Sequence, residues 1–145
     1  ILGERKLKDS STVFIDDYGH HPTEIKKTIE AIRDSYPDHN LKMVFQPHRY
    51  TRTKDLFDEF VGVLKNVDDL LLLNIYSAGE EPIEDIDSLH IKEALERSDF
   101  SDVELIEDTK HVFERINSFS DIDTVFVLQG AGDISSISKQ IEKEL

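Results

Sequence analysis

The stretch Val13-Phe14-Ile15 runs directly into Asp16-Asp17-Tyr18-Gly19-His20-His21-Pro22-Thr23-Glu24. The apolar, partly β-branched run is typical of a strand, and Pro22 suits the first turn of a helix, where its missing N–H does no harm. Between strand and helix, carboxylates, a phenol and imidazoles crowd around one glycine, a mixture that no core needs. An open α/β sheet binds its ligands where strands end and helices begin. We therefore expect a functional loop at this point.

On the amino-terminal side, the sequence predicts a short first strand over residues 1–8, with Ile1, Leu2 and Leu7 as its apolar positions. Asp9-Ser10-Ser11 is a turn signal, and Thr12 to Ile15 forms the next strand. A tight turn joins antiparallel strands. We expect the first two strands to form a hairpin.

On the carboxy-terminal side, strand and helix patterns alternate. The predicted strands are Leu41–Phe45, Asp68–Tyr76, Val103–Ile106 and Thr124–Leu128. Helical spacing of apolar residues predicts five helices, marked by Ile25, Ile29, Ile32 and Tyr36; by Leu56, Phe57, Phe60, Val61 and Leu64; by Leu89, Ile91, Ala94 and Leu95 after an Asp87-Ser88 cap; by Val112, Phe113, Ile116 and Phe119; and by Ile134, Ile137, Ile141 and Leu145. The continuous run Leu70–Leu73 indicates a strand buried on both faces.

One strand followed by five strand–helix units predicts an α/β fold of three layers. We expect a six-stranded, mostly parallel sheet with one antiparallel strand and about five helices. The carboxyl ends of parallel strands share one edge of a sheet. Four loops should therefore converge there, namely Asp16–Pro22, Gln46–Arg52, Ser77–Glu80 and Gln129–Asp133.

Composition narrows the possible partners. The 145 residues fit one domain, and 31 acidic against 17 basic side chains give a formal net charge of −14. This charge argues against a nucleic acid or an anionic membrane as partner. Cysteine is absent, and we find neither a signal peptide nor an apolar run long enough to span a membrane. We expect a soluble, intracellular domain.

Arg49 and Arg52 are the candidate anion-binding residues. They lie three positions apart at a predicted helix start, so their guanidinium groups can point the same way. Two such groups suit a carboxylate or a phosphate, which arginine binds bidentately. The alternative is a pair of ordinary surface arginines in an acidic protein. The neighbouring Pro47, His48 and Tyr50 favour a site.

The first loop also has the composition of a metal site, because imidazoles and carboxylates are ligands of zinc and manganese. The alternative is that one histidine caps the helix and one aspartate pairs with an arginine.

Gly130-Ala131-Gly132 allows either an anion site at a helix start or a tight strand-to-helix turn. The turn is favoured, since the lysine of a phosphate loop is missing.

Four motifs, in order along nearly the whole chain, resemble the carboxy-terminal domain of the Mur ligases. They are Asp16–Glu24, Phe45-Gln46-Pro47-His48-Arg49-Tyr50-Thr51-Arg52-Thr53, Tyr76-Ser77-Ala78-Gly79-Glu80 and Gln129-Gly130-Ala131-Gly132. Within the family, the Gln46–Arg52 run is similar to that of the members that add L-alanine to UDP-N-acetylmuramate. It differs from that of the members that attach a recycled tripeptide.

The resemblance implies a Rossmann-like domain of a three-domain, cytoplasmic ligase of peptidoglycan synthesis. ATP, with Mg²⁺, would activate the muramate carboxylate as an acyl phosphate, which the amine of L-alanine attacks. By resemblance, Asp17 contacts ATP near the ribose; His20, Arg49 and Arg52 hold the alanine carboxylate, and Tyr18 and His48 lie beside them. The phosphate loop and the magnesium ligands belong to the central domain. The resemblance therefore assigns no catalytic residue and no metal ligand to this chain, and we expect the chain alone to be inactive.

Two other functions stay open on the sequence. One is a metal-dependent hydrolase that uses Asp16, Asp17, His20, His21 and His48. The other is a non-catalytic α/β binding module, for which we would expect an exposed apolar patch away from the loop edge.

Overall fold

The computed structural model describes residues 3–6, 11–118 and 122–144. Its six strands form one sheet in the order β1-β2-β6-β3-β4-β5. Their bounds are β1 Gly3–Lys6, β2 Ser11–Asp17, β3 Asn40–Gln46, β4 Asp69–Leu73, β5 Val103–Ile106 and β6 Thr124–Gly130. The α/β class is confirmed.

The pairing of the strands agrees with the predicted sheet. β1 is antiparallel to β2, with Gly3 opposite Phe14, and every other pairing is parallel. β4 lies between β3 and β5, so the Leu70–Leu73 run is internal, as predicted. Ile1, Leu2 and Leu7 of the expected first strand, and Asp9-Ser10 of the expected turn, lie outside the described residues.

The described residues contain six helices rather than the five expected. They are α1 Pro22–Ser35, α2 Tyr50–Asp55, α3 Phe57–Leu64, α4 Ser88–Arg97, α5 Thr109–Ser118 and α6 Ile134–Glu144. The extra helix is α2, which has no apolar stripe because Thr53 is its only buried residue. Leu56 separates α2 from α3 with φ −116° and ψ 22°. Phe119 and Leu145, expected in the last two stripes, lie outside the described residues.

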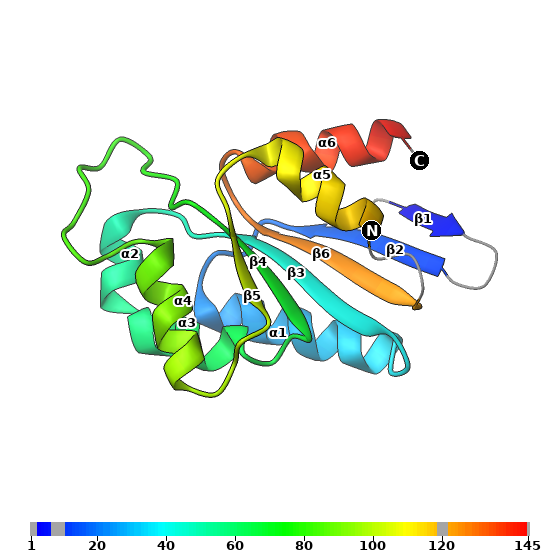
Figure 1. Cartoon of the computed structure of the whole chain (residues 1–145), viewed down its shortest axis with the longest axis horizontal. Coiled ribbons are helices and arrows are strands. Elements are labelled where there is room, and N and C mark those ends of the chain that lie inside the picture. The colour runs from blue at the N-terminus through cyan, green and yellow to red at the C-terminus, as the bar shows by residue number, and fades with distance from the viewer. Residues whose placement is uncertain (1–2, 7–10, 119–121, 145) are drawn as a thin grey trace.

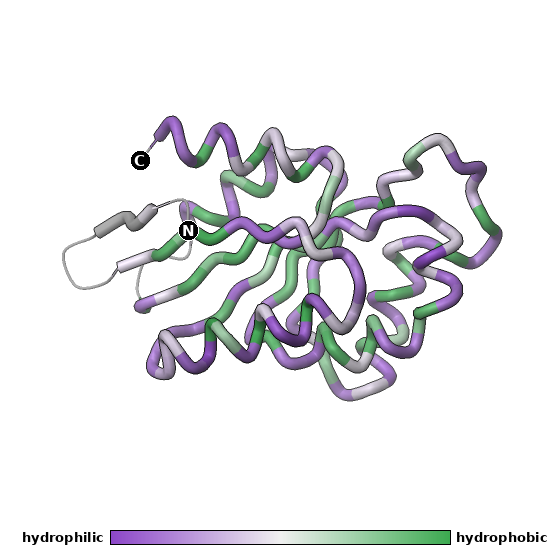
Figure 2. Tube along the Cα trace, turned by 180° about the vertical axis from the view of Figure 1, so that it is seen from behind, coloured by the Kyte–Doolittle hydropathy of each residue, from purple (hydrophilic) through white to green (hydrophobic). Residues whose placement is uncertain are grey.

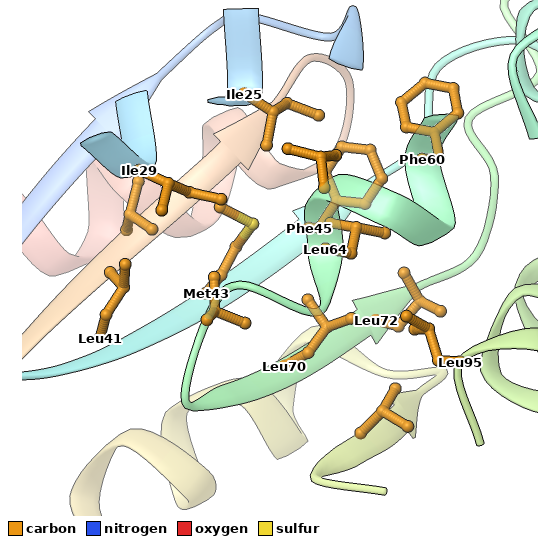
Figure 3. Close-up of a cluster of buried hydrophobic side chains, with 14 of the residues drawn as sticks. Ile25, Ile29, Leu41, Met43, Phe45, Phe60, Leu64, Leu70, Leu72 and Leu95 are labelled. Atoms are coloured by element: carbon orange, nitrogen blue, oxygen red, sulfur yellow. The ribbon is translucent and has the colours of Figure 1, made fainter. Parts of the chain in front are cut away.

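The helices cover both faces of the sheet (Figure 1). α1, α3 and α4 pack on one face, where Met43, Phe45, Phe60 and Leu72 belong to the larger core (Figure 3). α5 and α6 cover the other face. The hydrophobic residues follow the strands and the inward sides of the helices (Figure 2). Burying each large apolar side chain stabilises the folded state by roughly 1.5–3 kcal/mol, so the loops are attached to a stable sheet.

The four predicted loops meet at the carboxyl ends of the parallel strands. α2 and the long segment between β4 and α4 lie together at one end of the molecule (Figure 1). The Arg49 N–H donates to the Tyr76 carbonyl at 2.8 Å, which links the second loop to the third. Among the described residues, no helix has the length and apolar composition that crossing a bilayer needs.

Candidate functional site

Asp17 ends β2 and is held by neutral side chains. Its Oδ2 accepts from Thr28 Oγ1 at 2.8 Å and from Gln129 Nε2 at 2.7 Å. Gln129 also donates to the Gly19 carbonyl at 2.7 Å and is fully buried. A Cβ on Gly19 would lie only 2.9 Å from Asp17 Oδ2, so a larger residue there would displace this carboxylate. Asp17 is therefore tied to the last strand and to α1 by an amide and a hydroxyl group.

His21 caps α1. Its Nδ1 accepts from the Thr23 N–H at 3.1 Å, and Glu24 Oε1 accepts from the His21 N–H at 3.1 Å. This reciprocal capping box satisfies two donors at the helix start. The interpretation of one histidine as a helix cap is confirmed for His21.

His20 faces away from this cap and toward the second loop. Its Nδ1 lies 3.1 Å from the Tyr18 carbonyl, and its ring centroid lies 5.3 Å from that of His48. The side chain of Tyr18 is not brought into the cluster, since the residue is 65% exposed. Of the three aromatic residues between Tyr18 and His21, only His20 meets the arginine loop.

Gln46, at the end of β3, is a structural residue. Its Oε1 accepts from the Ile134 N–H at 2.9 Å, and its Nε2 donates to the Asn74 carbonyl at 3.2 Å and to Asp133 Oδ2 at 3.3 Å. The side chain is buried and joins the ends of β3 and β4 to the start of α6. It fixes where the chain enters the arginine loop.

Arg49 precedes α2 in a strained backbone conformation, with φ 74° and ψ 140°. Residues with a Cβ avoid this region, and strain of this kind gathers at functional sites. Hydrogen bonds hold the backbone in place: the Arg49 N–H donates to Tyr76, and Thr53 Oγ1 donates to the Arg49 carbonyl at 2.8 Å. The Arg49 side chain is 45% exposed at the crevice.

Arg52 and His48 form a second, more buried unit. Arg52 donates from one nitrogen to His48 Nδ1 and to the His48 carbonyl, each at 3.0 Å. Burial is the largest cause that lowers the pKa of His48, and the nearby Arg52, His20 and Arg49 lower it further, while Glu80 opposes them. His48 is therefore neutral near pH 7. Both arginines lie close enough to act on this imidazole, as the predicted pair requires.

Tyr76 was not among the predicted site residues, yet it supports the imidazole cluster. Its ring stacks on His48 at 5.6 Å between centroids and 19° between planes. A Cβ on Gly132 would lie 2.6 Å from the Tyr76 ring, so this glycine lets the ring approach. The Gly130–Gly132 segment is thus the tight strand-to-helix turn that the sequence favoured.

Glu80 is the second residue that the sequence reasoning did not assign. Its two oxygens accept from the Thr51 N–H at 3.1 Å and from Thr51 Oγ1 at 2.6 Å. These hydrogen bonds, with a smaller contribution from Arg49, lower the pKa of Glu80. Its Oε2 is 3.8 Å from an Arg49 nitrogen, too far for a good hydrogen bond. In the sequence, the only sign that Glu80 belongs to the site is that it is an acidic residue in one of the four predicted loops.

The two arginines therefore lack a close carboxylate. Arg49 has the distant Glu80, and within the described part of the chain no carboxylate lies within ion-pair distance of Arg52. Both side chains are at least partly exposed, so water solvates them and they remain available to an anion. The geometry can bind a small carboxylate or phosphate between two guanidinium groups.

A cavity of about 250 Å³ opens beside the first loop. Ile15, Ile32 and Tyr36 give it apolar walls, and Asp17 and Thr28 lie at its polar side. Larger hollows of about 540 and 400 Å³ lie between α1 and α3, and neither is lined by Arg49 or Arg52.

The family model of the Mur ligases, described as "Mur ligase, glutamate ligase domain", matches residues 4–132. The chain belongs to the Mur ligase family. This confirms the resemblance given by the four motifs, all of which lie inside the matched residues.

Solved structures of similar fold include three from this family. UDP-N-acetylmuramate–alanine ligase from Thermotoga maritima is 26% identical with a TM-score of 0.68, over 92% of this chain and 26% of that one. A murein peptide ligase from Psychrobacter arcticus is 17% identical with a TM-score of 0.68, over 91% of this chain and 27% of that one. A domain assigned to a UDP-N-acetylmuramate:L-alanyl-γ-D-glutamyl-meso-diaminopimelate ligase of Haemophilus ducreyi is 18% identical with a TM-score of 0.64. The match covers 96% of this chain and 97% of that one. The chain thus spans about a quarter of the length of the first two.

The two open alternatives gain no support from the geometry. Within residues 3–6, 11–118 and 122–144, no three His, Asp or Glu side chains come together as a set that could hold a metal ion. The exposed large apolar side chains in the same ranges are Tyr18, Tyr76, Leu89 and Ile122. They lie on four separate segments, and two of them belong to the loop edge.

Proposed function

We propose that this chain is the amino-acid-binding domain of a cytoplasmic, ATP-dependent ligase of peptidoglycan synthesis. In the intact enzyme, central and amino-terminal domains would bring the phosphate loop and the UDP-N-acetylmuramate site. ATP, with Mg²⁺, supplies the phosphate that activates the muramate carboxylate. The amino acid that this domain presents is L-alanine. Membership of the Mur ligase family and the similarity to the Thermotoga maritima enzyme support the proposal.

One observation carries the assignment of the amino-acid site: Arg49 and Arg52 flank a neutral His48 and lack a close carboxylate among the described residues. A small amino acid offers little apolar surface, so its carboxylate must provide most of its orientation. Two guanidinium groups can fork that carboxylate. Because Arg52 occupies His48 Nδ1, the proton of neutral His48 is on Nε2, which can donate a further hydrogen bond.

Asp17 is the proposed contact to the nucleotide. Gln129 and Thr28 both bind its Oδ2, and no described residue donates to its Oδ1. The free oxygen can accept from ribose hydroxyls, and the neighbouring 250 Å³ cavity offers apolar surface for the rest of the nucleoside. The phosphates would lie beyond this chain, since the phosphate loop is expected in the central domain.

Steady-state kinetics of the full-length ligase test the proposal. Arg49→Ala should raise KM for alanine by the loss of one charge-assisted contact, about 1.5–3 kcal/mol, or roughly 10- to 150-fold. KM for ATP should change little. Arg49→Lys should recover only part, because a point charge does not fork a carboxylate.

Arg33→Ala is the matched control, because Arg33 is ion-paired with Asp68 at the opposite edge of the sheet. It should leave both KM values unchanged. If Arg49→Ala and Arg52→Ala both raise KM for ATP and spare alanine, the arginines bind the nucleotide and the proposed assignment is wrong.

A further inference from the structure

We infer that His20 is a catalytic residue that accepts a proton from the ammonium group of the incoming amino acid. The inference rests on the proposed function and deepens it. The resemblance gives His20 a carboxylate contact, which calls for a donated hydrogen bond. The partners of the two imidazoles lead to a different role.

The two facing histidines are held in opposite tautomers. Arginine only donates, so Arg52 at 3.0 Å makes His48 Nδ1 an acceptor, and the proton of neutral His48 is on Nε2. A carbonyl only accepts, so the Tyr18 oxygen at 3.1 Å makes His20 Nδ1 the donor. Neutral His20 therefore carries a lone pair on Nε2, and no described residue donates to it. One ring offers a donor and the other an acceptor, with centroids 5.3 Å apart.

An amino acid needs both a hydrogen-bond donor and an acceptor in its site. Its carboxylate requires donors, which the arginines and His48 Nε2 provide. Its ammonium group requires an acceptor and must lose a proton before it can attack. Neutral His20 would repel a carboxylate but accept from an ammonium group. The N–H bond of the ammonium breaks as the Nε2–H bond forms, and the imidazolium later releases this proton to water.

The remaining steps balance without another base. The free amine forms the C–N bond at the acyl phosphate carbon as the C–O bond to phosphate breaks. The second amine proton leaves with the phosphate. His20 is thus needed once in each cycle, for the first proton only.

The other acceptors near the arginines are already occupied or out of reach. Glu80 is bound by Thr51, and its lowered pKa makes it a weak base. Glu24 uses Oε1 to accept from the backbone N–H groups of His21 and His20 at the start of α1, which ties this carboxylate to the helix cap. Gln129 Oε1 has no hydrogen-bond partner, but the residue is fully buried. The charged and titratable groups in contact with His20 are His48 and Glu24, and Arg49, Arg52 and Glu80 act on the facing His48.

The test uses His20→Gln in the full-length ligase, with His21→Gln as the matched control because His21 only caps α1. At saturating alanine and neutral pH, amide formation by His20→Gln should fall about 10²–10⁴-fold, the usual contribution of a general base. Raising the pH should restore the rate about tenfold per unit, because more free amine is then present. KM for alanine should change little.

Hydroxylamine provides the second measurement. It is largely unprotonated at neutral pH and traps the acyl phosphate without a base. His20→Gln should therefore form the hydroxamate at the wild-type rate, which also shows that the variant is folded. A raised KM for alanine with normal kcat, a rate loss that pH does not restore, or an equal loss of hydroxamate formation would each overturn the inference.

Failure of the proposed function is distinguishable. A wild-type enzyme that ligates a different amino acid contradicts the alanine assignment, and the His20 comparison is then made with that amino acid. The expected pH rescue is the same, because every amino acid presents an ammonium group and a carboxylate.

Discussion

The two ends of the sheet use charge in opposite ways. At the amino ends of the strands, Arg33 pairs with Asp68 at 3.0 Å and Lys42 with Asp69 at 2.8 Å. At the carboxyl ends, neutral Gln46 and Gln129 make the structural links, and Arg49 has a carboxylate no closer than 3.8 Å. Ion pairs hold one end together. Amides make the links at the other end, where the two arginines have no carboxylate closer than 3.8 Å among the described residues.

The largest expected effect comes from removing an amide at the carboxyl end. Gln129→Leu leaves the Gly19 carbonyl without its donor and removes one of the hydrogen bonds to Asp17 Oδ2. It also removes Gln129 Oε1, which has no hydrogen-bond partner. We expect the free energy of unfolding in urea to fall by about 2 kcal/mol, independently of salt.

Gln140→Leu is the control, because Gln140 lies exposed on α6. It should change stability by less than about 0.5 kcal/mol. Equal effects of the two variants would contradict the structural role of Gln129.

An intermediate effect is expected from the ion pair at the amino end. Asp68→Asn removes the charge that faces Arg33, at a cost of about 1 kcal/mol at pH 7, because the partly exposed pair is screened. Burial works to raise the pKa of Asp68, but the hydrogen bonds from Arg33 and from the Leu41 N–H outweigh it, and the pKa lies below 3.8.

The sign of the pH dependence follows from this lowered pKa. The ionised form is favoured in the folded state, so its stabilisation is complete above pH 3.8 and is lost as the pH falls below that value. In urea unfolding at several pH values, the free energies of unfolding of wild type and Asp68→Asn should converge only below pH 3.8. Asp38→Asn, on the exposed turn after α1, should give no such convergence.

The smallest expected effect is a preference for glycine over alanine at Arg49, which is the reverse of the usual preference in a helix. Glycine tolerates the φ of 74° at Arg49, so Arg49→Gly should be more stable than Arg49→Ala by roughly 0.5–1 kcal/mol. In the middle of α4 the same comparison at exposed Glu93 should favour alanine by about 1 kcal/mol. Thermal unfolding of the four variants decides this. An Arg49→Gly variant less stable than Arg49→Ala would show that the backbone at Arg49 carries no strain.

Sequence periodicity predicted the sheet well because each strand is a short apolar run and each long helix has an apolar stripe. It missed α2, whose one buried residue is Thr53, since polar helices leave no hydrophobic signal. The spacing of Arg49 and Arg52 predicted that both lie at one loop, and both act on the imidazole of His48. The roles of Gln129 and Glu80 were not, because their partners Asp17 and Thr51 are distant in sequence and meet only through the strand order.

The strand order also has a consequence for synthesis. β6, the last strand in the sequence, lies between β2 and β3, with Gln129 opposite both Asp17 and Phe45. A chain growing from its amino terminus carries both loops long before the strand that places them side by side. A chain that stops before Thr124 therefore carries every proposed ligand-binding residue but no assembled crevice, so the proposed site can form only after β6 has been synthesised.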